Sequence, residues 1–117
     1  MKKIIIALFG ISLVLAACKK DEIITYDCTG LTPTYTDDVK QIMDTKCATS
    51  GCHNATTKAD GYDFSSYTAV SGEADREVFM GSMQHLGQYV AMPLNGAKLN
   101  EDQLQIISCW IENGMPE

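Results

Sequence analysis

Two cysteines and a histidine stand close together near the middle of the chain, in the stretch Cys47-Ala48-Thr49-Ser50-Gly51-Cys52-His53. Two thiols followed directly by an imidazole are typical of covalent haem attachment, in which the thiols bond to the haem vinyl groups and the histidine reaches the iron. The usual motif has two residues between the cysteines, and this stretch has the less common four. The pattern predicts haem bound at Cys47 and Cys52, with His53 on one face of the iron.

Two other uses of these residues compete with haem. Zinc also binds cysteine and histidine, but a closed zinc site needs four ligands, generally in closely spaced pairs. The chain offers Cys47, Cys52, His53 and, far along the sequence, His85, without a second close pair. A plain disulfide between Cys47 and Cys52 is the other alternative, because cysteines of exported proteins commonly pair. The histidine directly after Cys52 favours haem over both.

The first seventeen residues have the features of a signal peptide. Met1-Lys2-Lys3 is a short basic start, and residues 4–17 are mainly apolar and too short for a comfortable membrane span. The stretch Leu15-Ala16-Ala17-Cys18 resembles a bacterial lipobox, whose cysteine is lipidated and becomes the first mature residue. An ordinary signal peptide followed by an unrelated cysteine is the alternative. The small residues before Cys18 favour lipidation, and two or three acyl chains on one cysteine anchor a protein stably.

Residues 18–33 are expected to be a lipidated tether, and residues 34–117 one folded domain. The tether continues Lys19-Lys20-Asp21-Glu22, without the aspartate directly after Cys18 that would signal inner-membrane retention. This favours the outer membrane, on its periplasmic face or at the cell surface. Without the signal peptide, seven basic and fifteen acidic side chains remain, a net charge of −8. Such a charge excludes nucleic-acid binding through phosphate neutralisation and favours a basic or neutral docking partner.

The number of cysteines agrees with this interpretation. The chain has five. If Cys18 carries lipid and Cys47 and Cys52 carry haem, only Cys28 and Cys109 remain. Thiols pair in an oxidising compartment, so we expect a Cys28–Cys109 disulfide.

Apolar residues recur at helical spacing through the domain, and no convincing strand pattern or repeat appears. A first helix is expected to begin near Thr36, which can cap it, and to reach Cys47. A short helix capped by Ser65 or Ser66 should follow, broken by Gly72. Another helix is expected over residues 73–86.

Asn100 is expected to cap the final helix, with acidic residues in its first turn and Trp110 on its buried face. Asn113-Gly114 should stop this helix. The fold class predicted for the chain is therefore all-α.

The order of these features resembles the class I cytochrome c fold, and more narrowly the small single-haem cytochrome c domain of bacterial envelope lipoproteins. The matching segments are residues 34–42, the haem motif at 47–53, residues 61–67, Met92-Pro93, residues 99–104 and residues 110–114. Together they cover residues 34–116. The four-residue gap between Cys47 and Cys52 departs from the family and leaves open whether both thioethers form.

The resemblance implies one covalent haem c, with His53 as proximal and Met92 as distal iron ligand. It also implies single-electron transfer to and from a redox protein, without a reaction catalysed by the chain itself. Iron with both axial positions filled has no open site for a substrate, and Met/His ligation raises the reduction potential.

Met92 is favoured over the other methionines because Pro93 follows it and stiffens a non-helical backbone. The remaining five fall in the signal peptide, in helical segments or beyond the final helix: Met1, Met43, Met80, Met83 and Met115. His85 is the alternative distal ligand, and would give a bis-histidine site of lower potential.

Two further functions stay open at this point. One is a small haem peroxidase or ligand sensor in which the Met92 bond opens, with His85 and Arg76 as the side chains available on the distal side. The other is a disulfide-stapled interaction lipoprotein without haem.

Overall fold

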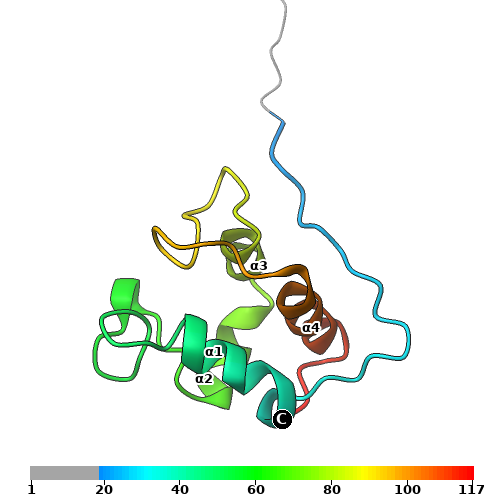
Figure 1. Cartoon of the computed structure of the whole chain (residues 1–117), viewed down its shortest axis with the longest axis horizontal. Helices are drawn as coiled ribbons and strands as arrows, with labels where there is room; N and C mark the ends of the chain where they lie inside the picture. Colours follow the sequence, from blue (N-terminus) through cyan, green and yellow to red (C-terminus); the bar gives the residue numbers. More distant parts are fainter. Residues whose placement is uncertain (1–18) are drawn as a thin grey trace, which may run out of the picture.

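The structure, a computed structural model, describes residues 19–117. The expected signal peptide and Cys18 lie outside the described residues. The elements in chain order are a π-helical turn η1 (Tyr35–Val39), α1 (Lys40–Lys46), a 3-10 turn η2 (Ala59–Gly61), α2 (Tyr67–Ala74), α3 (Glu77–Met83) and α4 (Glu101–Glu112), arranged as in Figure 1. Residues 19–117 contain no strand, which confirms the all-α class. None of the helices within this range is long and apolar enough to cross a membrane.

The first helical segment begins two residues earlier than expected. Thr34 has an extended backbone, and its side chain accepts a hydrogen bond from the backbone of Asp37 at 3.2 Å. In return the Asp38 carboxylate accepts from the Thr34 N–H at 2.9 Å. The expected cap, Thr36, instead lies inside η1. These two hydrogen bonds satisfy backbone N–H groups that have no partner within the helix. Thr34 therefore caps the helix better than Thr36 would.

The region between residues 66 and 86 differs from the sequence prediction. Ser66 caps α2, as expected, by accepting from the Ala69 N–H at 3.4 Å. Gly72 does not break this helix, because a single glycine costs a helix only about 1 kcal/mol and burial of α2 offsets it. The break lies at Arg76, whose backbone is extended. The next helix, α3, ends at Met83 rather than residue 86, because His85 has a φ of 58°.

The final helix, α4, forms where the sequence places it. Asn100 and Gln103 make a complete capping box, and Gly114 follows the helix with a φ of 84°. Trp110 is fully buried and its indole N–H donates to the Pro116 carbonyl at 2.8 Å. The chain end therefore folds back over α4.

One hydrophobic core joins η1, α1, α2, α3 and α4. Its members are Tyr35, Val39, Ile42, Met43, Val70, Ala74, Phe79, Met80, Met83, Leu99, Leu104, Ile107 and Trp110. The loops at residues 47–66 and 84–99 extend from this core on one side (Figure 1). The helices thus form a base that carries both segments predicted to bind haem.

Residues 20–31, which we call the strap, lie against the domain. The side-chain amide of Gln84, which is 4% exposed, accepts from the Ile24 N–H at 2.8 Å and donates to the Ile24 carbonyl at 2.7 Å. Further along, a Cys28–Cys109 disulfide joins the strap to α4, as the cysteine count predicts. Asn113 donates to the Leu31 carbonyl at 2.9 Å. Cys28 is therefore one of several points that fasten the expected tether.

Candidate functional site

The end of α1 positions the predicted haem motif. Cys47 is the C-cap residue, and its N–H donates to the Met43 carbonyl at 2.9 Å. The chain turns through Gly51, whose φ is 80°, and the His53 N–H donates back to the Cys47 carbonyl at 3.1 Å. The four residues between the two cysteines thus form a turn. The histidine backbone is bonded directly to the first cysteine.

Both cysteines of the motif are free thiols, so the alternative Cys47–Cys52 disulfide is not formed in this structure. Cys52 is exposed, whereas Cys47 is half-buried against the core. Burial, and secondarily the nearby Cys52, raises the pKa of the Cys47 thiol to about 11. Cys47 therefore keeps its proton at neutral pH, and both sulfurs are available for a bond to a cofactor.

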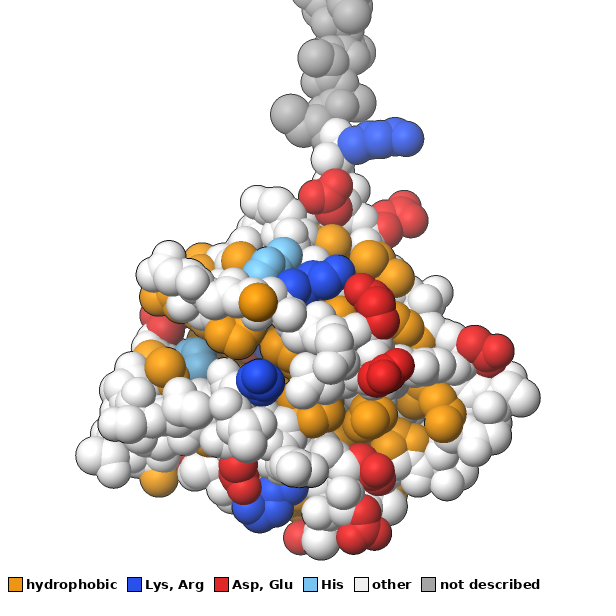
Figure 2. Space-filling view, in the orientation of Figure 1, with side chains coloured by type: hydrophobic (Ala, Val, Ile, Leu, Met, Phe, Trp, Pro, Cys, Tyr) orange, Lys and Arg blue, Asp and Glu red, His pale blue; other side chains and the backbone are white. Residues whose placement is uncertain are grey.

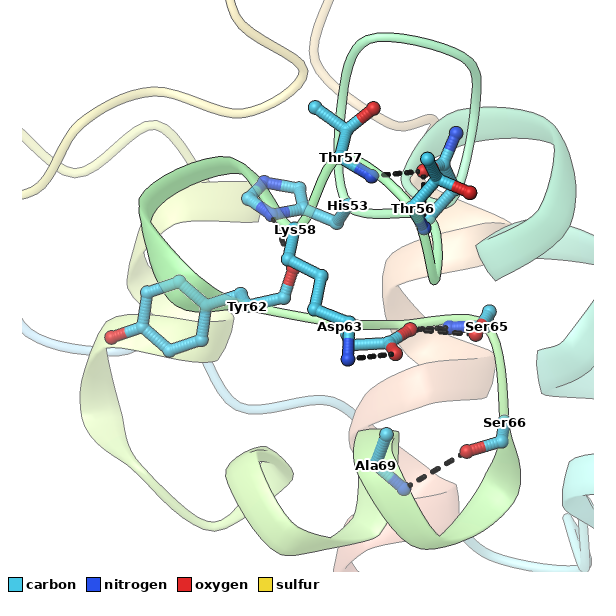
Figure 3. Close-up of polar contacts among 10 residues, drawn as sticks. His53, Thr56, Thr57, Lys58, Tyr62, Asp63, Ser65, Ser66 and Ala69 are labelled. Carbon is cyan, nitrogen blue, oxygen red and sulfur yellow. Dashed lines mark hydrogen bonds and ion pairs between the residues drawn. The ribbon is translucent and has the colours of Figure 1, made fainter.

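His53 is buried and its ring is oriented by a backbone carbonyl. Its Nδ1 lies 3.4 Å from the Tyr62 oxygen, at the long end of the hydrogen-bonding range (Figure 3). With Nδ1–H donating to that oxygen, Nε2 keeps its lone pair. Histidines that bind metals usually donate their other ring N–H in this way, which fixes the tautomer and the ring plane. His53 therefore has the arrangement of a metal ligand.

The polar loop after His53 places the Tyr62 carbonyl. Asn54 accepts from the backbone N–H groups of the two threonines that follow at 3.0 and 2.7 Å, and Asp63 accepts from the Ser65 N–H and hydroxyl at 2.9 and 2.6 Å (Figure 3). Lys58 pairs with Asp63 at 3.4 Å. Hydrogen bonds from Ser65, helped by Lys58, lower the pKa of Asp63 below 3.8. Hydrogen bonds and an ion pair between residues of this loop therefore hold its conformation.

Aromatic rings connect His53 to the helical core. The His53 ring centroid lies 4.9 Å from that of Phe64, which meets the Phe79 ring of α3 edge-on at 5.5 Å. Phe79 is 7% exposed and belongs to the core. These rings give the histidine an apolar wall, as a large flat cofactor requires.

Met92 is held by its backbone in the loop after α3. Its N–H donates to the Ser82 carbonyl at 3.0 Å, and its carbonyl lies 2.9 Å from Nε2 of His85. The peptide bond between Met92 and Pro93 is cis. The half-buried Met92 side chain contrasts with Met43, Met80 and Met83, which are core residues. The two candidate distal ligands thus share one hydrogen-bonded unit, in which His85 Nε2 is already engaged.

Figure 2 shows a hollow on this face of the molecule, between the loop at residues 84–99 and the loop at residues 47–66. Hydrophobic side chains form its walls, and a histidine is visible on each side. The two loops that carry the predicted ligands therefore face the same space.

The residues considered for the alternative functions have different partners in the structure. Arg76 pairs with Glu73 and lies over the Tyr62 ring at 5.9 Å, beside the carbonyl that orients His53, whereas His85 contacts Met92. Across residues 19–117, no three His, Cys, Asp or Glu side chains converge into a metal site. The four-ligand zinc arrangement is therefore not assembled.

Sequence reasoning did not give Tyr62 or Gln84 a role. Tyr62 contacts His53 through its backbone oxygen. Every residue has such an oxygen, so the type of residue 62 does not predict this contact. Gln84 is a buried amide that binds the strap across sixty residues. Its position beside the apolar stripe of α3 is the only signal that could have revealed it.

Comparison of the chain with models of protein families, with characterised proteins and with solved structures finds no match in any of the three.

Proposed function

We propose that this chain is a c-type cytochrome lipoprotein that carries single electrons through one covalently bound haem in the bacterial cell envelope. The observation that carries the proposal is the orientation of His53. Its Nδ1 faces the Tyr62 carbonyl at 3.4 Å, which leaves Nε2 for iron, and the residue stands directly after a free thiol.

The donor set fits haem c. Cys47 and Cys52 stay unpaired while Cys28 and Cys109 form a disulfide, so the unpaired thiols are the pair adjacent to a histidine. Each S–H can add across one vinyl double bond, forming a C–S and a C–H bond without net oxidation. The apolar wall of Phe64 and Phe79 supports the flat ring system.

The thioether of Met92 would be the second protein ligand of the iron. The bond from its N–H to Ser82 and the contact of its carbonyl with His85 hold the backbone on both sides of the side chain. When bound, haem supplies a one-electron iron couple, and Met/His ligation places it at a higher potential than a bis-histidine site. The residues of the chain orient both ligands.

The expected location is the outer membrane, with a lipid anchor at Cys18 and a redox protein as donor or acceptor. The net charge of −8 expected for the mature chain favours a neutral or basic docking surface on that partner. Cys18→Ser should release the protein from membranes. Retention of this variant at the parent level would contradict the anchor.

The test of haem attachment is the intact mass of the mature protein made in cells with haem-attachment machinery. One added haem that survives a denaturing gel is the expected result. Cys52→Ala should lose at least one thioether, and Cys28→Ala is the matched control that should keep both. A colourless parent protein, or full covalent haem in Cys52→Ala, would overturn the assignment and favour the interaction lipoprotein without haem.

A further inference from the structure

The N-terminal end of the strap lies against the loop that follows α3. The Asp21 carboxylate accepts from the Gly87 N–H at 3.1 Å, and the Asp21 carbonyl accepts from the Gln88 side chain at 2.6 Å. Next to it, Lys20 pairs with Glu77 at 2.9 Å and lies over the ring of Tyr89 at 5.8 Å. Lys20 and Asp21 are thus bound to this loop by three contacts and to the start of α3 by a fourth.

The strap then runs away from this loop to the opposite end of the domain. The disulfide at Cys28 and the bond from Asn113 to Leu31 fix its far end near the C-terminal end of α4. In Figure 1 the described chain enters at the top, on the side of the loop after α3, and reaches the bottom before η1 begins. The two ends of the strap therefore mark two opposite poles of the molecule.

The pole next to the start of the chain carries the most exposed apolar side chains. In residues 19–117 four large hydrophobic side chains are exposed, and the two highest values belong to Val90 at 62% and Leu94 at 64%. These two residues flank Met92-Pro93. The other two are Ile24 at 47%, within the strap, and Leu31 at 38%, at its far end. Exposed apolar side chains gathered in one short loop mark an interaction surface.

The length of chain between this loop and the expected anchor is short. Asp21 is three positions after Cys18, and this length of chain extends to at most about 11 Å. Val90 is two residues beyond Gln88, or about 7 Å. A lipid on Cys18 therefore holds Val90 within about 25 Å of the point where the acyl chains enter the bilayer.

We propose that residues 87–94 rest on the lipid surface, with Val90 and Leu94 inserted at the boundary between headgroups and acyl chains. This inference rests on the lipid anchor of the proposed function. The contacts of Lys20 and Asp21 place the start of the strap beside this loop, so the anchor lies on the same side of the domain as the loop. The loop that holds Met92 then faces the membrane, and the C-terminal end of α4, near Cys109 and Asn113, lies toward the opposite pole.

The experiment is photocrosslinking of the full lipidated holoprotein in vesicles of phosphatidylcholine and phosphatidylethanolamine that contain a phospholipid with a diazirine in its acyl chain. Crosslinked lipid is then mapped by peptide mass spectrometry. We expect label in the peptide that contains residues 87–94, and little in peptides from α1 or α4. Val90→Asp with Leu94→Asp should lose this label, because charged side chains are expelled from the apolar region. Leu31→Asp is the matched control and should keep it.

Each outcome decides the inference. Equal label over all peptides, or label confined to peptides outside residues 87–94, overturns it and leaves this loop as a surface for a protein partner. Persistence of the label in the double aspartate variant also overturns it. The mass of the mature N-terminus identifies the source of failure. An unacylated Cys18 refutes the anchor and this inference together, whereas an acylated protein with an unlabelled loop refutes this inference alone. Haem content is measured separately and does not enter the result.

Discussion

Replacement of both Cys28 and Cys109 by alanine should remove a large part of the stability of the domain. The disulfide closes a loop with a sequence separation of 81 residues. On the chain-entropy model a cross-link over such a loop disfavours the unfolded state by about 4.5 kcal/mol at 25 °C. Domains of this size unfold with about 5–15 kcal/mol in total, so the expected loss is a large fraction.

The folded state should keep the strap in place without the cross-link. Gln84 bonds both backbone groups of Ile24, and Gln105 donates to the Asp27 carbonyl at 2.7 Å. Each such hydrogen bond contributes about 0.5–1.5 kcal/mol, and none of them restrains the unfolded chain. The effect of the double variant should therefore appear mainly in the unfolded state, as a steeper dependence on denaturant together with a lower midpoint.

The assay is urea unfolding of the holoprotein released from the membrane by Cys18→Ser, followed by circular dichroism. Cys28→Ala alone breaks the same cross-link and leaves the buried Cys109 side chain in place. It should therefore agree with the double variant to within about 1 kcal/mol, apart from the packing lost at residue 109. A loss below about 1 kcal/mol in both variants, with an unchanged denaturant slope, would refute the loop-closure argument.

Three further predictions concern the loop after α3 and the strap. Gly81→Ala would place a methyl group 2.2 Å from the Tyr89 ring, so that ring must move, and we expect a loss of about 1–3 kcal/mol in urea unfolding. Met92→Ala should change the oxidised absorption spectrum and lower the reduction potential, whereas His85→Ala should change both less, because His85 acts on the methionine carbonyl. Burial, and then its hydrogen bond to a glutamate of α4, raises the pKa of Tyr26 to about 12. The stability that this tyrosine contributes is complete below pH 10 and is lost as the pH rises toward 12, so Tyr26→Phe should lose less stability than the parent over this range.

Each of these predictions has a control. Gly72→Ala in α2 meets no atom within 4 Å and should be neutral or stabilising by up to about 1 kcal/mol. A destabilisation equal to that of Gly81→Ala would show that the Tyr89 contact is not the cause.

For the ligand variants the control is Met115→Ala, which should leave the spectrum unchanged. If His85→Ala changes spectrum and potential while Met92→Ala does not, His85 is the distal ligand. Equal losses of stability between pH 10 and 12 in Tyr26→Phe and the parent would contradict the Tyr26 assignment.

Sequence alone predicted the features that depend on neighbouring residues. The Asn100 cap, a cap at Ser65 or Ser66 (Ser66 in the structure) and the stop after α4 all join groups three or four positions apart. The spacing of Cys47, Cys52 and His53 is likewise local, and it predicts the chemistry without a fold. The Cys28–Cys109 pair is the exception, because it followed from counting the cysteines, although the residues are distant in sequence.

Only the tertiary structure decided the features that depend on contacts between distant segments. The continuation of α2 through Gly72 depends on burial against the rest of the domain, which propensity does not include. The Tyr62 carbonyl beside His53 and the hydrogen bond from His85 to Met92 use backbone oxygens, which every residue type supplies equally. The strap is held by Gln84 and by the loop at Gly87, which lie 60 and 66 residues along the chain from their partners. A backbone acceptor has no signature in a residue type, so its partner becomes known only when the folded chain brings the two groups together.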